Sequence, residues 1–378
     1  SAIEHLSKPL IGREIEDLMA SFGATFNALA EHPALRWLGP HTGVTHLAIA
    51  SIANACFDLW AKARGQPLWK LLLSLSDEQL VDLLDLSYLD DVLTREEALH
   101  LLALERPARA GRESVLDAGI PGYDTSAGWM DCTDEEITER SRGAVEQGFK
   151  AVKLKVGGLA VGSEQRDLHR LGLVSDAVGD KIRIAFDANQ QWTVEQAIHV
   201  SGLLSSVVKP LFIEEPTHPH DVAAHAAIAA AIHPTPVAVG ESIPNRVVFK
   251  NFMMAGAVQV CQIDPTRLGG VGEAITCALM ARKLNLRVIP HVGDMGQVSQ
   301  HLCLFYHVAL GHQLEFLEYI PHLREYFVHP AEVREGRYVV PDKPGASMSI
   351  VSAEAAARIM ESGEPTHMHE GATFLGDE

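Results

Sequence analysis

The spacing of apolar residues divides the chain into two parts of different character. Up to about residue 110, apolar residues recur at helical spacing, as in "LAIASIANACFDLWAKARGQPLWKLLLSL", where "GQP" interrupts the pattern. Another helix is predicted to begin after Thr94, whose side chain can form a capping box with Glu97 three residues later. The first part of the chain is therefore predicted to be mainly helical.

From about residue 150, short apolar runs alternate with helix-like stretches, which is the pattern of a parallel α/β sheet. The runs are "AVKLKV", "RIAFDA", "PLFIEEP", "PVAVGE", "VQVCQID", "LRVIPH" and "LEFLEY". The polar residues that end them lie 23 to 32 residues apart. One strand–helix unit of a (β/α)8 barrel has roughly 30 residues, so this part of the chain is predicted to form a TIM-type barrel.

Each run ends in a charged or titratable side chain, whereas unrelated strand ends would also include glycine, serine, asparagine and threonine. The seven residues are Lys155, Asp187, Glu214, Glu241, Asp264, His291 and Glu318. In barrels of this type the active site lies at the C-terminal ends of the strands. We therefore expect these side chains to face one common pocket.

Composition narrows the classes of partner. The chain has 378 residues, with 31 Lys plus Arg against 49 Asp plus Glu, and a net charge of −18. This charge argues against nucleic acid and anionic membrane as partners, although lysines or a metal can make one pocket attract an anionic substrate. The five cysteines form no CxxC pair, no apolar stretch approaches the length of a membrane span, and the start lacks a signal-peptide core. These features predict a cytoplasmic protein.

Three consecutive runs end in carboxylates, in "FDAN", "IEEP" and "VGES". In one pocket, Asp187, Glu214 and Glu241 would repel one another strongly unless a cation neutralised them. Hard oxygen ligands select Mg²⁺ or Mn²⁺ over zinc. The alternative is a set of unrelated surface acids, and the occurrence of three on consecutive runs favours the metal site.

Lys153 and Lys155 are two residues apart, so in a strand they point to the same face. Crowded positive charge near a divalent cation lowers the pKa of a lysine, which allows the lysine to act as a general base. The alternative is a solvated pair on an edge strand, which fits poorly with the Ala, Val and Leu neighbours in this run.

Asp264 and His291 end adjacent runs. A carboxylate that is hydrogen-bonded to one imidazole nitrogen fixes the tautomer and raises the basicity of the other nitrogen. His291 is thus predicted to be a second acid–base group, although with 19 histidines in the chain a purely structural role is the alternative. Glu318 ends the next run and, if protonated, could hydrogen-bond a developing enolate oxygen.

These residues in this order resemble the enolase superfamily, in its mandelate-racemase-like branch. The stretches "LRWLGP", "TSAGW", "KLKVGG", "DANQQW", "IEEPT", "NRVVFK", "QIDPTRLGGVGE" and "EGRY" also resemble the L-fuconate dehydratase group, which includes other sugar-acid dehydratases such as fungal L-galactonate dehydratase. The resemblance implies a modified TIM barrel of the (β/α)7β type over residues 121–340. It also implies a capping domain over residues 1–120, with its helical part present and its N-terminal sheet absent, and a C-terminal segment, 341–378, that returns toward the cap.

The resemblance implies a role for each matching residue and a homo-oligomeric assembly. The implied ligands of one Mg²⁺ per active site are Asp187, Glu214 and Glu241. The implied catalytic residues are Lys155 as base, Lys153 as its assistant, the dyad of Asp264 and His291 on the opposite face, and Glu318 at the substrate carboxylate. The implied substrate-binding residues are Lys153, Asn189, Trp37 and Trp129.

Two positions depart from the group. Gln191 replaces an arginine, and Asp124 replaces a neutral threonine. We expect Asp124 to place an extra acid near the substrate and thereby to shift specificity.

The implied function is that of a Mg²⁺-dependent hydro-lyase that acts on a small-molecule sugar acid, as L-fuconate dehydratase does. Removal of the C2 proton and loss of the 3-hydroxyl would give a 2-keto-3-deoxy sugar acid. Whether Lys155 or His291 takes the proton depends on the C2 configuration. Two alternatives remain open: a racemase or epimerase of a 2-hydroxy acid that uses the same two bases, and a catalytically silent sugar-acid binder.

Overall fold

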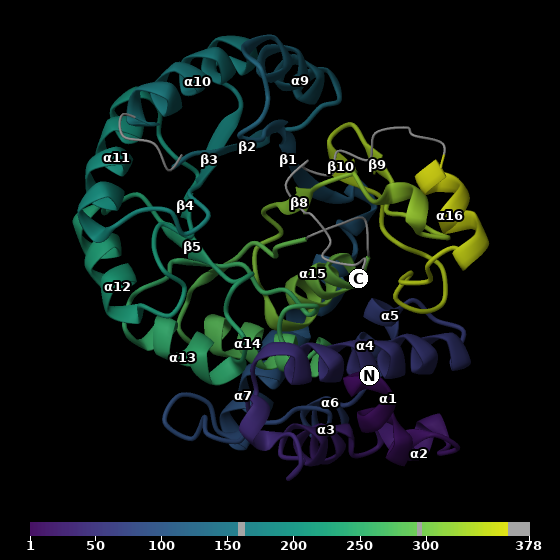
Figure 1. The fold of residues 1–378 in the computed structure, drawn as a ribbon. Coiled ribbons are helices and arrows are strands. Elements are labelled where there is room, and N and C mark those ends of the chain that lie inside the picture. Colours follow the sequence, from purple (N-terminus) through teal and green to yellow (C-terminus); the bar gives the residue numbers. More distant parts are fainter. Residues whose placement is uncertain (158–162, 293–296, 362–378) are drawn as a thin grey trace, which may run out of the picture.

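Seven strand–helix units and an eighth strand form the centre of the computed structural model, which describes residues 1–157, 163–292 and 297–361. Figure 1 shows the strands inside an arc of helices. The strands are β1 (Ile120–Gly128), β2 (Ala151–Lys155), β3 (Arg183–Asp187), β4 (Ile213–Glu214), β5 (Val237–Val239), β6 (Val260–Cys261), β7 (Arg287–Val288) and β8 (Leu317–Tyr319). The helices that connect them are α9 (Asp134–Glu146), α10 (Ser163–Val178), α11 (Val194–Val207), α12 (Val222–Ala231), α13 (Arg246–Met254), α14 (Val271–Lys283) and α15 (Val298–Leu310).

The strand order is that of a barrel. Neighbouring strands from β1 to β7 pair in parallel, and β8 returns to pair in parallel with β1. Two short strands, β9 (Val333–Arg334) and β10 (Arg337–Tyr338), form an antiparallel hairpin that joins the start of β1. The predicted α/β barrel of the (β/α)7β type is therefore confirmed.

The interior of the barrel is a packed core. Aromatic side chains from β1, from the residue before β4 and from the residue before β8 fill it together with small alanines, which leave room for the large rings. The main members are Tyr123, Phe212, Phe316, Ala151, Ala185 and Ala238. These apolar side chains fill the interior of the barrel, so the polar side chains gather at the C-terminal ends of the strands.

The register of the parallel strands brings their last residues side by side. Lys155 on β2 lies opposite Asp187 on β3, which in turn lies opposite Glu214 on β4. Glu241 and Asp264 follow β5 and β6 by two and three residues. The strand ends thus meet at one face of the barrel, as parallel pairing requires.

One barrel strand is missing from the seven predicted runs. β1 has the sequence "IPGYDTSAG", and the proline and two glycines within it hide the alternation typical of a strand. Pro121 is tolerated because it lies at the start of the strand, where it pairs only with the β9–β10 hairpin. Gly128 lies so close to β2 that an added Cβ would lie 2.4 Å from the carbonyl oxygen of Lys153.

Residues 1–119 are helical, and the structure, which describes all of them, has no strand there. The α-helices are α1 (Ala2–Ser7), α2 (Ile15–Met19), α3 (Phe22–Ala30), α4 (Gly43–Ala63), α5 (Leu68–Ser74), α6 (Asp77–Asp82), α7 (Arg95–Glu105) and α8 (Arg109–Glu113). Short 3₁₀ turns connect them, at η1 (Lys8–Leu10), η2 (Arg36–Leu38), η3 (Arg106–Ala108) and η4 (Leu116–Ala118). The predicted capping box of Thr94 and Glu97 is confirmed at the start of α7.

Helix α4 comes closer to a membrane span than the sequence analysis expected. Its 21 residues are long and apolar enough to cross a membrane, but 67% of the 18-residue stretch that meets this criterion is buried inside the protein. Figure 1 shows α4 beside the barrel, between α14 on one side and the N-terminal helices α1 and α3 on the other. It is therefore placed as a core helix between the N-terminal helices and the barrel.

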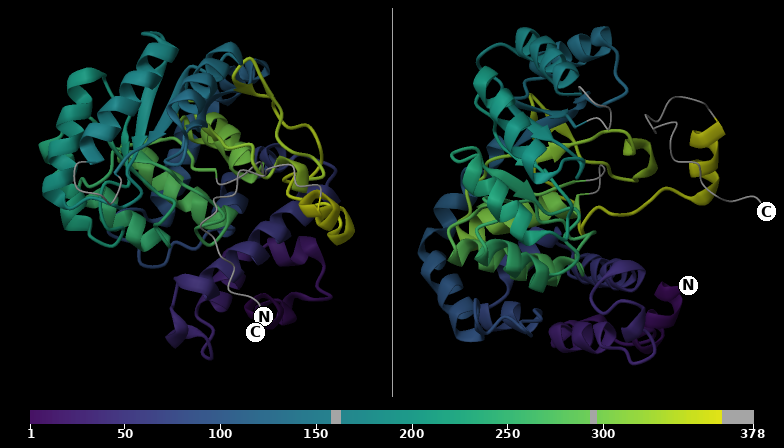
Figure 2. Two further views of the ribbon diagram at one scale, coloured as in Figure 1. Left: turned by 45° about the horizontal axis from the view of Figure 1, so that its top comes forward. Right: turned by 60° about the vertical axis from the view of Figure 1, so that its left-hand side comes forward.

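The segment after β10 runs along the N-terminal helices. The N–H of Gly345 donates to the carbonyl of Gln66 at 2.9 Å, and the N–H of Ala346 donates to Asp58 on α4 at 2.7 Å. A turn, η5 (Arg324–Tyr326), precedes the hairpin, and α16 (Ala353–Glu361) follows it at the outer side of the molecule (Figure 2). Residues 362–378 of the predicted C-terminal segment lie outside the described residues, and the predicted domain boundaries remain a prediction.

Candidate active site

The three carboxylates predicted to bind a metal come together at the end of the barrel. Asp187, Glu214 and Glu241 each offer an oxygen, and these oxygens lie within 4.8 Å of one another. Asp187 and Glu214 are fully buried, and the side chain of Glu241 is 19% exposed. Buried carboxylates this close repel one another, and an all-oxygen donor set is what Mg²⁺ and Mn²⁺ prefer. The residues present therefore fit a hard divalent cation.

The two lysines of β2 point into the same cluster. The Nζ of Lys153 lies 2.9 Å from Glu214 and 2.6 Å from Glu318, while the Nζ of Lys155 pairs with Asp187. Both side chains are buried, so the predicted alternative of a solvated edge pair is wrong. Lys155 also lies 5.0 Å from the ring centre of Trp129, a cation–π contact.

Without a cation, the pKa values of both lysines are raised. Burial by itself disfavours the ammonium of Lys153, but the carboxylates of Glu214 and Glu318 outweigh it and raise the pKa of Lys153 well above its usual range. Burial likewise opposes the charge of Lys155, and Asp187 raises its pKa. In the protein without a cation, each lysine is closer to a carboxylate than positive crowding can offset. The lowered lysine pKa expected beside a bound divalent cation stays a prediction.

Asp264 and His291 form the predicted pair on the other side of the cluster. The Nδ1 of His291 lies 2.7 Å from Asp264, and its Nε2 lies 3.0 Å from Glu241 and 3.7 Å from Glu318. Burial opposes a charge on this imidazole, but hydrogen bonds to Asp264 and Glu241 raise the pKa of His291 well above its usual value. The imidazole is thus held between two carboxylates, which favours its protonated form.

Glu318 connects the two sides of the cluster. Its carboxylate accepts a hydrogen bond from the hydroxyl of Thr125 at 2.7 Å and another from the N–H of Val292 at 3.3 Å. Burial would raise its pKa, yet Lys153 and His291 lower it below the usual value. This lowered pKa favours the ionised form of Glu318, which accepts these hydrogen bonds. The expectation that a protonated Glu318 donates to an enolate oxygen stays a prediction.

A second layer of residues, which the sequence analysis did not identify, supports the carboxylates from behind. The amide of Gln190 donates to Glu215 at 2.8 Å and to Ser242 at 2.7 Å, which connects the loops after β3, β4 and β5. Burial and the nearby Glu241 raise the pKa of Glu215 to about 7. The pair of glutamates in "IEEP" was a signal that could have pointed to Glu215.

The structure separates the predicted substrate-binding residues. Trp129 and Lys153 lie in the cluster, whereas Trp37 lies on η2 with 81% of its surface exposed, so the structure does not bring it into the cluster. Asn189 is half-buried just after β3 with a φ of 43°, a left-handed conformation that asparagine tolerates. Its N–H donates to Asp187 at 2.9 Å, so its backbone orients that carboxylate.

Asp124 does not lie where the sequence analysis expected. Its neighbours on β1, Tyr123 and Thr125, face the barrel interior and Glu318, so the alternation of the strand turns Asp124 outward. Its Oδ1 accepts a hydrogen bond from the N–H of Ser126 at 2.7 Å, and burial raises its pKa. The prediction of an extra acid near the substrate is therefore wrong, because that side of β1 packs away from the cluster.

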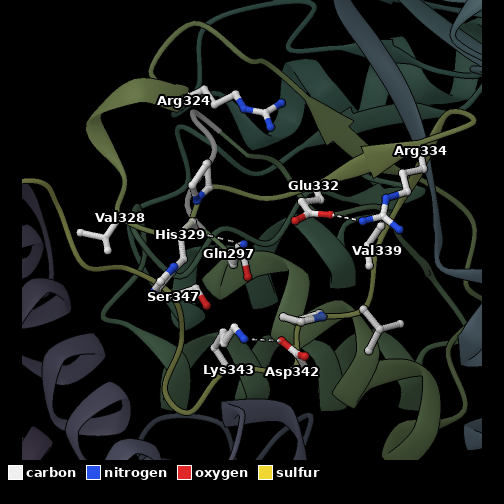
Figure 3. Close-up of a pocket in the computed structure, with 13 residues that line it drawn as sticks. Gln297, Arg324, Val328, His329, Glu332, Arg334, Val339, Asp342, Lys343 and Ser347 are labelled. Atoms are coloured by element: carbon white, nitrogen blue, oxygen red, sulfur yellow. Dashed lines mark hydrogen bonds and ion pairs between the residues drawn. The ribbon is translucent and has the colours of Figure 1, made fainter. Parts of the chain in front are cut away.

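A separate hollow lies between residues 324–347 and Gln297, which precedes α15 (Figure 3). Its volume is about 460 Å³, and its walls carry the ion pairs of Arg334 with Glu332 and of Lys343 with Asp342. Gln297 donates to the carbonyl of His329 across the hollow at 3.0 Å. None of its lining residues belongs to the carboxylate cluster, so this hollow is distinct from the candidate active site.

The fold and the cluster have counterparts among known proteins. Residues 136–355 match the family described as "Enolase C-terminal domain-like". The chain is 38% identical over 358 residues to L-galactonate dehydratase of Hypocrea jecorina, a match that covers 93% of this chain and 78% of that protein. It is 37% identical to mitochondrial enolase superfamily member 1 of Homo sapiens, with 92% of this chain and 79% of that protein covered.

Solved structures agree with these matches. The crystal structure of the human mitochondrial enolase superfamily member 1 superposes with a TM-score of 0.89 at 36% identity and covers 94% of this chain and 80% of that one. L-talarate/galactarate dehydratase of Salmonella typhimurium, liganded with Mg and L-lyxarohydroxamate, superposes with a TM-score of 0.73 at 25% identity and covers 94% of this chain and 75% of that one. The catalytic roles predicted for individual residues of this chain remain predictions.

Proposed function

The chain belongs to the enolase superfamily, and from this membership we propose that it is a Mg²⁺-dependent hydro-lyase that removes water from a sugar acid. One observation carries the proposal: two lysines on one side of three clustered carboxylates face a carboxylate–imidazole pair on the other side. Two proton-transfer groups on opposite faces are what removal of one proton and expulsion of a neighbouring hydroxyl require.

The carboxylate cluster of Asp187, Glu214 and Glu241 would hold the cation. A bound Mg²⁺ would stabilise the negative charge that develops on the substrate carboxylate as the C2 proton leaves. The structure of the related Salmonella dehydratase is liganded with Mg, which supports this choice of metal. The same three residues would bind one ion per active site.

Lys155 is proposed to remove the C2 proton. A lysine must be neutral to accept a proton, and Asp187 is the main group that keeps Lys155 charged. When a cation shares the charge of Asp187, this support for the ammonium weakens and the pKa of Lys155 falls. Lys153, deeper in the strand, stays next to Glu214 and Glu318 and is proposed to face the substrate carboxylate.

His291 is proposed to complete the elimination from the opposite face. The C2–H bond and the C3–O bond break, C2 and C3 become doubly bonded, and the Nε2 proton of His291 leaves with the hydroxyl as water. The resulting enol takes up a proton at C3, releases the proton of its C2 hydroxyl, and becomes a 2-keto-3-deoxy sugar acid. Asp264 holds the Nδ1 side of His291, which keeps Nε2 directed at the cluster.

The substrate is proposed to be a six-carbon sugar acid, with L-galactonate and L-fuconate as the first candidates. The match to a named L-galactonate dehydratase supports the former, and the resemblance of the sequence stretches supports the latter. A homo-oligomer is proposed on the same resemblance. The cytoplasmic location remains a prediction, and several relatives bear the word mitochondrial in their names.

A library of sugar acids, incubated with the protein and Mg²⁺ and followed by mass spectrometry, tests the proposal. We expect one or a few acids to lose the mass of one water and to give a 2-keto acid, with no product after chelation of the metal. An unchanged mass with inverted configuration would instead indicate a racemase or epimerase. Absence of both product and C2-proton exchange in deuterated water across the library would indicate a silent binder.

A further inference from the structure

Helix α4 touches the loop that carries Asp264, although 210 residues of chain lie between Asn54 and Pro265. The carboxamide of Asn54 is buried and holds the loop at two points. Its Nδ2 donates to the carbonyl of Pro265 at 3.0 Å, and its Oδ1 accepts from the N–H of Val271 at 2.9 Å. One side chain thus fixes both the beginning and the end of the β6–α14 loop.

Helix and loop approach each other closely at Gly270. Gly270 has a φ of 98°, and an added Cβ would lie 2.8 Å from the Cβ of Ala53 and 2.9 Å from the Oδ1 of Asn54. Only a glycine allows the helix and the loop to approach this closely. Glu273 on α14 forms a second contact between the loop and α4. Its Oε2 accepts a hydrogen bond from the N–H of Gly269 at 2.6 Å and lies 2.8 Å from the Nε2 of His46 on α4.

The hydrogen bond at Pro265 acts on a rigid unit. The carbonyl of Pro265 and the N–H of Thr266 belong to the same planar peptide group and point in opposite directions. Asn54 holds the carbonyl, and the N–H donates to the Oδ1 of Asp264 at 2.7 Å. The hydroxyl of Thr266 donates to the same oxygen at 2.7 Å.

With Oδ1 occupied in this way, the other oxygen of Asp264 is left for His291. The Oδ2 of Asp264 lies 2.7 Å from the Nδ1 of His291. A rotation of the Pro265–Thr266 peptide would move Oδ1 and, because the carboxylate is planar, Oδ2 with it. The orientation of the imidazole therefore depends on a helix outside the barrel.

We propose that Asn54 is a positioning residue that sets the orientation of the Asp264–His291 pair through the Pro265–Thr266 peptide. The effect of Asn54 on catalysis depends on the proposed function, whereas its effect on the orientation of the pair depends on the geometry alone. Asn54 contacts neither the carboxylate cluster nor any atom that would react.

Two variants separate the contributions of the carboxamide. Asn54→Asp has the same shape and keeps the acceptor for Val271, but it places an oxygen against the carbonyl of Pro265 and repels it. Asn54→Ala removes both bonds, and a hollow of about 270 Å³ beside Asn54 and Thr266 lets water replace part of what is lost. The effect of Asn54→Asp should therefore exceed that of Asn54→Ala. If the aspartate variant does not fold, the alanine variant is measured in its place.

The first measurement does not depend on turnover. In the full-length protein with Mg²⁺ and ¹⁵N-labelled histidine, the Nδ1 proton of His291 is identified by its loss in His291→Asn. We expect this signal to move or disappear in Asn54→Asp. Phe57→Leu, one turn further along α4 where the ring packs against Phe22, is the matched control and should keep the signal.

The second measurement is the split between kcat and KM with L-galactonate or another accepted sugar acid. We expect kcat to fall about 10- to 100-fold in Asn54→Asp, a range typical for partners one step behind a catalytic group, with KM within about twofold. Phe57→Leu should lower the melting temperature without this fall. A wild-type signal in Asn54→Asp, an unchanged kcat, or an equal fall of kcat in Phe57→Leu would overturn the proposal. If the wild-type protein dehydrates no sugar acid, the proposed function fails and the His291 signal alone decides whether Asn54 positions the pair.

Discussion

At the scale of single residues, the candidate site is a set of charges that compensate one another. Lys153 and Lys155 balance Glu214, Glu318 and Asp187, and His291 is bonded to Asp264 and Glu241. Each of these groups is buried or nearly so, where an unpaired charge would cost several kcal/mol. The balance explains why the lysines are charged without a cation, and it implies that cation binding and lysine ionisation are linked.

Removing either proposed proton-transfer group should greatly lower turnover but spare the metal ligands. For Lys155→Ala and His291→Asn we expect kcat to fall by roughly 10²- to 10⁴-fold, the usual contribution of general acid–base catalysis. Mg²⁺ affinity, measured by calorimetry, should stay within about tenfold, because neither side chain belongs to the predicted ligand set. His100→Asn, an exposed position on α7, is the control. Full activity in either variant would remove that residue from the mechanism.

At the scale of elements, helix α10 holds the loops that follow β1 and β2. Arg170 is 1% exposed, and its guanidinium donates to the carbonyls of Gly128 and Trp129 at 2.9 and 2.8 Å and to that of Met130 at 3.2 Å. These carbonyls fix the loop that places Trp129 next to Lys155. One turn earlier, Asp167 accepts from the N–H of Gly157 at 2.9 Å, just after β2.

Loss of this guanidinium should release Trp129. In Arg170→Gln, buried carbonyls lose their donors, each at a cost of roughly 1–3 kcal/mol, so we expect the free energy of unfolding to fall by about 2–4 kcal/mol. Tryptophan fluorescence should shift to longer wavelength as the ring becomes more exposed. Arg166→Gln is the control on the same helix, because Arg166 is exposed and, among the described residues, donates to the carbonyl of Met130 alone, at 2.6 Å. Equal effects of the two variants would contradict this role for Arg170.

At the scale of the whole molecule, acid should destabilise the protein through histidines buried in their neutral form. Burial lowers the pKa of His301 from its usual 6.5 to about 3 and that of His312 to about 4. His301 accepts a hydrogen bond from the N–H of Trp69 at 3.3 Å, which connects α15 to α5 and requires an unprotonated Nδ1. Protonation would therefore break a contact between the barrel helices and the N-terminal helices.

The pH dependence of stability follows from these shifts. A group whose pKa is lowered on folding contributes stability above its unfolded pKa and loses that contribution as pH falls toward the folded pKa. Between about pH 6 and pH 4, His301 should cost about 1.4 kcal/mol of unfolding free energy per pH unit. In denaturant titrations, His301→Gln should show a flatter pH dependence than the wild-type protein over this range. His199→Gln, exposed on α11, should retain the wild-type dependence; an equal change in both variants would refute the assignment.

The sequence by itself determined the barrel and the residues that end its strands. A strand–helix unit has a nearly constant length, and the carboxyl ends of parallel strands meet at one face, so the order of polar residues along the chain predicts their meeting in space. For this reason Asp187, Glu214 and Glu241 could be predicted to converge, and Asp264 to meet His291. β1 was not predicted, because its proline and glycines interrupt the alternation of apolar and polar residues on which a strand prediction depends.

Only the tertiary structure decided the ionisation and the support of the site. The pKa values of Lys155 and Glu318 depend on distances to side chains on other strands, and no local pattern encodes these distances. The outward direction of Asp124 depends on the register of a strand that was not predicted. The contact of Asn54 with Pro265 joins residues whose separation in the chain exceeds 200 positions, so it arises only when α4 packs against the β6–α14 loop.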